Sequence, residues 1–526
     1  SLATNDGRSL NWSGSLQMIY NRNFQKHNIN VSLGMEVSEN KSSSISANYK
    51  GFPDGNLTSL SYAQQIVDKP TESDNHTRLS GMFMRLNYSY KDIYLLDGSV
   101  RFDGSSEFGS DKKYAPFYAL GTGVNFHNYE FLKDNQILTN LKFTFTFGQT
   151  GKVNFPSYSA RTVYRTFDRW YIAGFGVGLK ALGNRDLKWE TTNKLNVGTD
   201  MEFWNSRISL VFDYYYNKTV DLITDVTLPG SAGFSSYKSN LGETLNKGFD
   251  IQFRFDVMKN KDWNVALWGN LNHNRNEILK ISDALKAYNS QVEDYYGLAE
   301  ESQTPTLSWT QAGKTYSDFI KPIMKYEEGA SLTAIYGVRS LGIDPSNGKE
   351  LYLYRNGQVS HKWKATEEVV LGDSEPKASG SFGLNATYKN FSLFASFGYE
   401  WGKQTYNETL IMNVENADIQ GSNVDKRVLT QRWEKPGDIA PLKDIKDMNS
   451  VTLPTSRFVQ DENVLSLDAL TLSYDFDPLW LRKIFLKTLR LEVSTNELFR
   501  LSSIKQERGT SYPFARTVNF SLRATF

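Results

Sequence analysis

The sequence predicts an all-β fold, a transmembrane antiparallel β-barrel with long external loops, on three observations. Apolar and polar residues alternate through many short segments, aromatic residues make up 14% of the 526 residues, and no apolar run has the length of a membrane helix. Alternation is typical of strands, because successive side chains point to opposite faces. A strand with one apolar and one polar face suits a wall between lipid and a water-filled lumen.

The last ten residues show this alternation most clearly. Their apolar face holds Val518, Phe520, Leu522, Ala524 and Phe526, and their polar face holds Thr517, Asn519, Ser521, Arg523 and Thr525. An aromatic residue at the end of such a strand is typical of a membrane interface. We therefore predict a C-terminal assembly strand in which Phe520, Leu522 and Phe526 face lipid.

The N-terminal part of the chain predicts six strands. Their apolar positions lie within residues 12–20, 29–37, 82–90, 94–102, 118–126 and 141–147. Short polar links around Lys26 and at Lys91-Asp92 make neighbouring strands into hairpins. Residues 38–78 are rich in serine and contain Pro53-Asp54-Gly55, so we expect a long loop there.

The rest of the chain continues the pattern, for about fifteen strands in all. The later strands lie within residues 195–203, 208–216, 249–255, 263–271, 382–388, 391–401, 470–476, 489–493 and 517–526. Long connections span residues 148–188, 217–241, 276–377 and 402–463, and a helix is expected from Ile281 to Ser302. Short turns on one side and long loops on the other are typical of outer-membrane barrels.

The strand count predicts how the chain is organised. Bacterial barrels have an even number of strands, so an odd count makes residues 1–526 the C-terminal portion of a larger barrel. In the 22-stranded class, whose lumen holds a plug, about seven strands are then missing. We expect a companion N-terminal polypeptide to carry the plug and those remaining strands.

Charge and residue content argue against several other function classes. The net charge is +1 with scattered Lys and Arg, which predicts no nucleic-acid partner. The histidines are not at metal-ligand spacing and cysteine is absent, so we expect no metal and no cofactor. No nucleophile elbow or phosphate-binding glycine loop is present, and acidic pairs such as Glu327-Glu328 suit solvated loops. We therefore name no catalytic residues and predict that the chain is not an enzyme.

Two groups of side chains are candidates for contact with a ligand or a plug. Aromatic rings beside polar groups in loops suit sugar rings and peptides, although packing between loops explains them equally well. These loop residues are Asp168, Arg169, Trp170, Tyr171, Tyr295 and Tyr296. The polar faces of the strands predict residues that hold a plug or line a passage, namely Asp200, Glu202, Asp250, Arg254, Asn264 and Glu400.

Several stretches, in order along nearly the whole chain, resemble the SusC/RagA family of TonB-dependent outer-membrane transporters. They are RFDGSSEFG at 101–109, NRDLKWETT at 184–192, NLGE at 240–243 with NKG at 246–248, GIDP at 342–345 with Asn347-Gly348, Gly372-Asp373 and Pro376, Arg432-Trp433 with PGD at 436–438, SRFV at 456–459, NELF at 496–499, and Tyr512-Pro513 with Ala515-Arg516. Two positions depart from the pattern, since Glu107 replaces a usual basic residue and Arg185 a usual proline.

The resemblance implies an importer in the outer membrane of a Gram-negative, Bacteroidota-like bacterium. It implies a SusD-like surface lipoprotein as lid, an oligosaccharide or peptide as substrate, and TonB acting through the plug. The sequence contains neither plug nor TonB box, so energised transport is expected to require the companion polypeptide. Two alternatives remain, a non-transporting barrel scaffold in a secretion or surface-assembly complex and an open porin without a plug.

Overall fold

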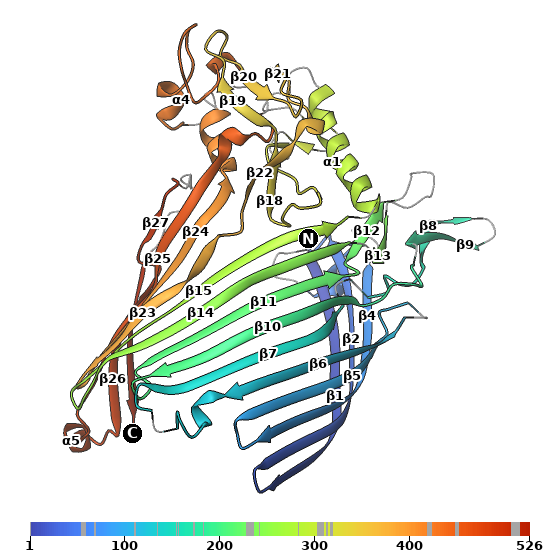
Figure 1. Cartoon of the computed structure of the whole chain (residues 1–526). Coiled ribbons are helices and arrows are strands. Elements are labelled where there is room, and N and C mark those ends of the chain that lie inside the picture. The colour runs from blue at the N-terminus through green and yellow to red at the C-terminus, as the bar shows by residue number, and fades with distance from the viewer. Residues whose placement is uncertain are drawn as a thin grey trace. The chain divides into compact units, whose positions relative to one another are not determined.

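The computed structural model consists mainly of antiparallel strands (Figure 1). It describes the whole chain except residues 1, 54–58, 68–69, 110–111, 134, 154, 156, 172–173, 182, 228–235, 241, 282, 302–309, 312–313, 316–318, 418–422, 448–451 and 506–515. Within the described ranges, the largest sheet contains 17 strands. Two of these strands, β3 and β27, have two and three residues. The other fifteen have nine residues or more, which confirms the predicted number of strands.

The bounds of the strands in this sheet are as follows. They are β1 (Leu2–Phe24), β2 (His27–Lys50), β3 (Gln65–Ile66), β4 (Thr71–Tyr90), β5 (Tyr94–Ser105), β6 (Tyr114–Asn125), β7 (Leu138–Lys152), β10 (Glu190–Phe203), β11 (Ile208–Val220), β14 (Glu243–Lys259), β15 (Trp263–Lys280), β23 (Ala378–Tyr388), β24 (Phe391–Tyr406), β25 (Val459–Asp475), β26 (Thr488–Asn496), β27 (Arg500–Ser502) and β28 (Thr517–Thr525).

One compact unit comprises residues 1–124, 144–195 and 218–243. Within it β1, β2, β4, β5 and β6 pair in that order as antiparallel neighbours (Figure 1). The register puts Leu16 opposite Met35, and Met35 opposite Met82. A slip of one residue would turn every apolar side chain to the other face, so the alternation itself specifies this register.

The predicted loop across residues 38–78 is wrong at both of its ends. Strand β2 continues to Lys50, and β4 begins at Thr71. Ser44 lies opposite Gly7 on β1 and Ser73 on β4, so the ladder satisfies the backbone groups on both sides. Serine and asparagine on both faces produce no alternation, and the sequence pattern therefore misses this part of the strands.

The second unit comprises residues 125–143, 196–217 and 244–526. Within it β15, β23, β24, β25, β26 and β28 are successive antiparallel neighbours (Figure 1). Aromatic pairs lie where the short turns join these strands, with ring centroids 4.3 Å apart for Trp263 and Tyr388 and 4.6 Å apart for Phe391 and Tyr474. Aromatic side chains at strand ends suit a membrane interface.

The long connections contain smaller elements. In the first unit these are the hairpins β8 (Val163–Tyr171) with β9 (Gly174–Ala181) and β12 (Ile223–Thr227) with β13 (Ser236–Asn240). In the second they are α1 (Asp283–Glu301), β16 (Thr310–Gln311), β17 (Lys314–Thr315), β18 (Ala334–Gly337), β19 (Arg339–Ile343), β20 (Glu350–Leu353), β21 (Val359–Ser360), β22 (Val369–Asp373), α3 (Glu408–Leu410) and α4 (Arg427–Thr430). Helix α5 (Pro478–Leu481) lies in the short connection between β25 and β26. Helix α1 confirms the helix predicted from Ile281 to Ser302. In the described ranges, no helix combines the length and apolar character of a membrane span.

Candidate functional site

A row of inward-facing positions crosses four neighbouring strands of the first unit. Ser15 of β1 lies opposite Glu36 of β2, which lies opposite Gly81 of β4. Gly81 in turn lies opposite Asp103 of β5. The guanidinium of Arg101, two residues before Asp103, donates from Nη2 to Glu36 Oε2 (2.9 Å) and from Nε to Asp103 Oδ1 (2.6 Å). One cation therefore joins carboxylates of β2 and β5 across β4.

Glycine at position 81 makes room for this bridge. A Cβ there would lie 2.2 Å from Asp103 Oδ1 and 2.8 Å from Arg101 Nη2. A ring supports the cation from another side, because the Arg101 guanidinium carbon lies 5.8 Å from the centroid of Phe83. That ring lies over Gly34, where a Cβ would come within 2.3 Å of it. Two glycines thus allow the large side chains to lie flat on the sheet.

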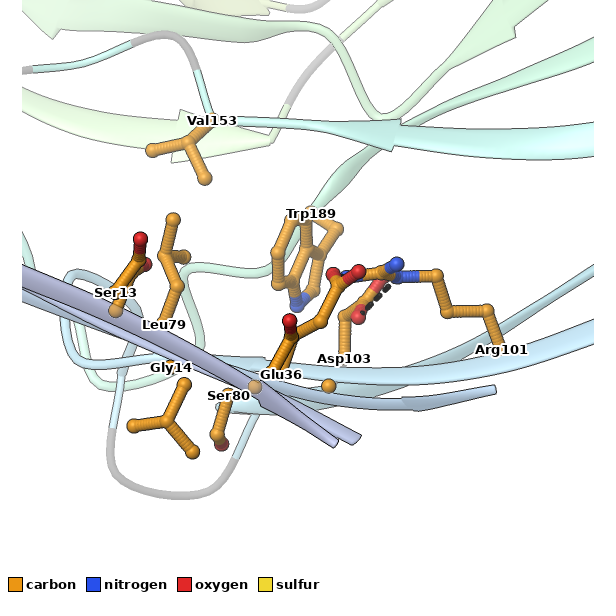
Figure 2. A pocket seen from close by; sticks show the side chains of 14 residues that line it. Ser13, Gly14, Glu36, Leu79, Ser80, Arg101, Asp103, Val153 and Trp189 are labelled. Carbon is orange, nitrogen blue, oxygen red and sulfur yellow. Dashed lines mark hydrogen bonds and ion pairs between the residues drawn. The ribbon is translucent and has the colours of Figure 1, made fainter. Parts of the chain in front are cut away.

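These side chains border a cavity of about 540 Å³ (Figure 2). Val153 and Trp189 also border it, and Figure 2 shows Trp189 above the group formed by Glu36, Arg101 and Asp103. A cavity with a few convergent polar groups beside apolar ones is a typical binding site. The Arg101 fork offers donors to carboxylate, carbonyl or hydroxyl oxygens, and the two carboxylates accept from hydroxyl or amide groups.

Two of the sequence motifs, 101–109 and 184–192, pack together beside this cavity. Phe108 and Leu187 are buried, and the Phe108 ring lies 4.5 Å from that of Trp189, measured between centroids. The backbone N–H of Gly109 donates to the Leu187 carbonyl at 3.1 Å. A Cβ at Gly109 would lie 1.7 Å from the carbonyl oxygen of Arg185, so only glycine allows this approach.

A third motif, at 240–243, is attached to the same place by one amide side chain. Asn240 Oδ1 accepts from the backbone N–H of Lys188 (2.9 Å), and its Nδ2 donates to the carbonyls of Lys188 (2.8 Å) and Asp221 (2.9 Å). The Lys188 ammonium forms an ion pair with the Asp221 carboxylate at 2.8 Å. Three motifs that are far apart in sequence, at 101–109, 184–192 and 240–243, therefore pack against one another in this unit. We call this contact region the packing joint.

A second joint, in the other unit, brings together the motifs around 342–348 and 432–438. Trp433 Nε1 donates to the Pro345 carbonyl at 2.9 Å, and so does the backbone N–H of Gly437 at 2.8 Å. Gly348 has a φ of +70°, and a Cβ on it would lie 2.5 Å from the Trp433 ring. Glycine is favoured there both by backbone conformation and by lack of space.

A buried ion network stabilises this second joint. Arg457 Nη2 donates to Glu350 Oε2 (2.9 Å) and to Glu415 Oε1 (2.6 Å), and Thr455 donates to Glu350 Oε1 (2.8 Å). Burial alone would raise the pKa of the Glu350 carboxyl, but the charge and hydrogen bonds of Arg457 outweigh burial and lower it. The two carboxylates in return hold the pKa of Arg457 above its ordinary value, despite its burial.

Comparison with known proteins identifies the family. Residues 2–417 match the family described as TonB dependent receptor-like, beta-barrel. The chain belongs to this family. As a TonB-dependent receptor-like β-barrel it is an outer-membrane protein, and the predicted resemblance and location are confirmed.

The relatives agree with this assignment. The chain is 28% identical to TonB-dependent receptor P3 of Formosa agariphila over 91% of this chain and 47% of that protein. It is 25% identical to TonB-dependent receptor SusC of Bacteroides thetaiotaomicron over 80% of this chain and 40% of SusC. These relatives are named as receptors and not as enzymes, in agreement with the prediction that the chain is not an enzyme.

Solved structures share the fold. A structure described as the RagAB peptide transporter superposes with a TM-score of 0.79 and 24% identity, over 95% of this chain and 53% of that one. The chain spans about half the length of the relatives that it matches.

The predicted ligand-binding residues of the TonB-dependent receptor chain fall into two places. Asp168, Arg169, Trp170 and Tyr171 lie in β8, and their side chains are outside the described part of the structure. Tyr295 and Tyr296 lie in α1 instead of an irregular loop. The ligand-binding role predicted for Tyr296 has no support in this conformation.

The burial of Tyr296 is the reason why its predicted ligand-binding role lacks support. Its ring is fully buried in a core with Phe319 and Trp363, and its hydroxyl donates to the Lys321 carbonyl at 2.6 Å. Tyr295 is half-buried and stacks on Phe319, with centroids 4.7 Å apart. Packing, the alternative explanation for loop aromatics, therefore accounts for Tyr296.

The predicted inward residues alternate with the apolar residues of β10, β14, β15 and β24. They are Asp200, Glu202, Asp250, Arg254, Asn264 and Glu400. Neighbouring polar groups already engage several of them, since Asn272 donates to Asp250, Arg254 to Asp256, and Lys403 to Glu400. Whether they hold a plug or line a passage stays a prediction.

The predicted C-terminal strand forms as β28. Phe520 and Leu522 of this strand and Phe526, the residue that follows it, are 77%, 68% and 80% exposed in the chain alone. The register places Phe520 opposite Val493 and Leu522 opposite Leu491 of β26. The apolar side chains thus share one face, and lipid contact for that face remains the prediction.

Sequence reasoning missed Glu36, Arg101, Asp103 and Trp189 as members of a site. Arg101, Asp103 and Trp189 were recognised only as motif residues, and Glu36 had no signal of its own beyond its inward position on β2. Their proximity depends on the register of three strands and on a glycine between two carboxylates. A charged residue at an inward position beside a glycine is the signal that could have found them.

Proposed function

We propose that the chain is the C-terminal barrel portion of a SusC-like importer that takes up glycans or peptides. The observation that carries this proposal is the inward cavity where Arg101 joins Glu36 and Asp103 beside Trp189. Paired donors and acceptors on a polar inner face suit the hydroxyls of sugars and the amides of peptides. The match to SusC and the likeness to a structure described as a peptide transporter support the choice of import.

The same polar groups suit a plug as well as a substrate. A plug held inside a barrel needs hydrogen bonds that can be made and broken in water, and solvated ion pairs contribute little net free energy each. We propose that a companion N-terminal polypeptide supplies this plug and the remaining strands of a 22-stranded barrel. TonB would then act through the plug, and a SusD-like surface lipoprotein would cover the external loops as a lid.

An uptake experiment with the complete complex tests this function. Arg101→Gln removes the charge that joins the two carboxylates, and Arg339→Gln, at the exposed first position of the short strand β19, is the matched control. Loss of a charged hydrogen bond of about 1.5–3 kcal/mol corresponds to roughly a tenfold or larger loss of uptake of labelled oligosaccharide or peptide. The amount of protein in the outer membrane is measured in parallel.

The outcome separates import from the alternatives. Reduced uptake at unchanged protein amount, with a lipoprotein and a plug-bearing polypeptide in the purified complex, supports the importer. Unchanged uptake in Arg101→Gln contradicts the role of the cavity. Several unrelated co-purifying subunits with no uptake in wild type would favour the scaffold, and constant high conductance would favour an open porin.

A further inference from the structure

Three strands of the first unit extend beyond the inward cavity with an uncharged inward face. Strands β1, β2 and β4 are neighbours there, and their register continues without a shift, so the inward positions follow Ser15 and Glu36 at every second residue (Figure 1). Four successive rows across β1, β2 and β4 are Asn11-Asn40-Thr77, Ser9-Ser42-Asn75, Gly7-Ser44-Ser73 and Asn5-Ser46-Thr71. We call these residues the hydroxyl-amide face, because all of them except Gly7 carry a hydroxyl or an amide group.

The outward face of the same strand segments is charged. Its rows are Trp12-Glu39-Arg78, Leu10-Lys41-His76, Arg8-Ser43-Asp74 and Asp6-Ile45-Glu72. Glu39 accepts from Trp12 Nε1 (2.7 Å) and Arg78 Nε (2.8 Å), and it lies 2.6 Å from His76 Nε2. Charged side chains are costly in lipid, so these segments lie in water beyond the apolar band. They lead into the long connection between β2 and β4, and long loops of such barrels lie outside the cell.

Strand propensity does not explain the composition of the hydroxyl-amide face. Asparagine is depleted in strands, whereas valine, isoleucine and threonine are favoured. Solubility does not explain it either, because charged side chains supply solubility on the outward face of the same strands. Hydroxyl and amide groups without charge are therefore a property of the inward face alone.

The hydroxyl-amide face is continuous with the inward cavity. Ser13 and Ser38 form the next row toward the short turns, and both border that cavity, as Figure 2 shows for Ser13. From Asn11 to Asn5 the face is about 20 Å long, and three strands make it about 10 Å wide. An extended ligand on this face can therefore reach the group formed by Glu36, Arg101 and Asp103.

The chemistry of the face matches sugar hydroxyls. Serine, threonine and asparagine side chains both donate and accept, as sugar hydroxyls do. Two bonds within the face, from Ser46 Oγ to Asn5 Oδ1 (3.2 Å) and from Asn11 Nδ2 to Ser9 Oγ (3.4 Å), are exposed, and a ligand can replace such bonds at little net cost. An extended peptide is recognised instead by a strand edge and by pockets for alternate side chains.

We propose that the hydroxyl-amide face binds an uncharged, extended oligosaccharide and guides it into the inward cavity. This inference rests on the proposed function and narrows its substrate from glycans or peptides to neutral glycans. Each neutral hydrogen bond contributes little net free energy in water, so the affinity comes from several rows acting together. A chain held by repeated weak contacts can move along the rows without breaking all of them at once.

Two mixtures offered to the complete complex test the substrate class. One contains neutral oligosaccharides from enzymatic hydrolysates of starch, xylan and laminarin, and the other contains the peptides of a casein digest. Molecules that the purified complex retains are released and identified by mass spectrometry. We expect retention of neutral oligosaccharides. Retention of peptides alone, or of nothing, overturns the proposal.

A double variant locates the binding site on the face. Ser42→Val combined with Ser44→Val removes two neighbouring hydroxyls, and valine is a better strand former than serine, so the strand is expected to form. The apparent affinity for the retained oligosaccharide should fall about tenfold. Ser43→Val, between them on the outward face, is the matched control and should bind as wild type does. Equal affinity of the double variant and wild type overturns the proposal.

The remaining outcomes separate this inference from the proposed function. Peptide uptake that is lost in Arg101→Gln but unchanged in the double variant keeps the importer and overturns the glycan face. Oligosaccharide binding that depends on Ser42 and Ser44, without any uptake by wild type, keeps the glycan face and contradicts the importer. Loss of a plug-bearing polypeptide from the complex of the double variant shows that the face holds the plug, and this also overturns the proposal.

Discussion

At the scale of single residues, glycines decide how the recognisable motifs pack. Gly81 leaves space for the Arg101 bridge, and Gly109 allows one chain segment to approach the backbone at Arg185. The sequence shows these glycines inside motifs but not what they meet, because the contacts join segments about 75 residues apart, as between Gly109 and Arg185. The motif pattern therefore predicts the family well and the contacts poorly.

Substitution at Gly109 tests the close approach. In Gly109→Ala a Cβ would lie 1.7 Å from the Arg185 carbonyl oxygen, and backbone must move to accommodate it. We expect a loss of about 1–3 kcal/mol in stability, as for other overpacked sites. Gly98→Ala is the control, since nothing lies within 4 Å of a Cβ there. Equal thermal stability of the two variants in detergent would contradict the packing joint.

Substitution at Leu522 tests which face of β28 meets lipid. Leu522 lies four residues before Phe526 on the exposed apolar face. Leu522→Arg should cost about 2–4 kcal/mol if it lies at the bilayer midplane, and it should lower the yield of assembled protein. Asn519→Ala, on the opposite face, should assemble normally. A larger loss in Asn519→Ala would mean that the two faces are reversed.

At the scale of elements, the sequence predicts the strands and helix α1. It does not predict the polar parts of β2 and β4 that lie next to the connection between them. Alternation marks a strand only where one face is apolar, so the sequence pattern predicts a loop for β2 beyond Val37 and for β4 up to Arg78. The buried charges of the loops were also unpredictable. Glu350, Glu415 and Arg457 are 42 to 107 residues apart in sequence, and only folding brings them together.

The buried network around Arg457 should be far more important for stability than an exposed pair. Arg457→Met removes the guanidinium that pairs with both buried carboxylates, Glu350 and Glu415, and should cost about 3–5 kcal/mol. Arg490→Met is the control, because its 2.6 Å ion pair with Asp475 is about half exposed and should contribute about 0–1 kcal/mol. Thermal denaturation of both variants measures the difference. Similar losses would show that burial does not strengthen the network.

Another buried carboxyl, that of Glu368, predicts a pH dependence of the loop region. Burial raises the pKa of Glu368 to about 7, and the nearby Lys325 offsets only part of this effect. The unfolded chain ionises Glu368 near pH 4.5, so stability falls as the pH rises from about 4.5 to 7 and is constant above that range, with a loss of up to roughly 3 kcal/mol.

The variant Glu368→Gln isolates this contribution. The amide does not titrate, so the stability difference between wild type and Glu368→Gln should change between pH 5 and pH 8 in favour of the variant. Hydrogen exchange of α1 and β22 in the two proteins measures it locally. A difference that is independent of pH would show that Glu368 titrates normally in the folded protein.

At the scale of the whole molecule, one physical claim underlies the account. Alternate side chains of fifteen strands contact lipid on one face and water on the other, and the motifs that resemble the family join the loops outside the membrane. Family membership supports this arrangement for the chain, whereas the importer, its plug, its lid and its substrate remain proposals. The absence of cysteine from the chain makes the claim directly accessible to experiment.

Single cysteines along β24, each carrying a fluorescent label in the reconstituted complex, test this claim most directly. Leu393, Ala395 and Phe397 are outward positions, and Ser392, Ser396 and Gly398 are inward positions of the same strand. We expect a lipid-soluble quencher to act on the outward labels and a water-soluble quencher on the inward ones, with a period of two residues. Quenching without this period, or outward labels protected from the lipid-soluble quencher, would contradict the account.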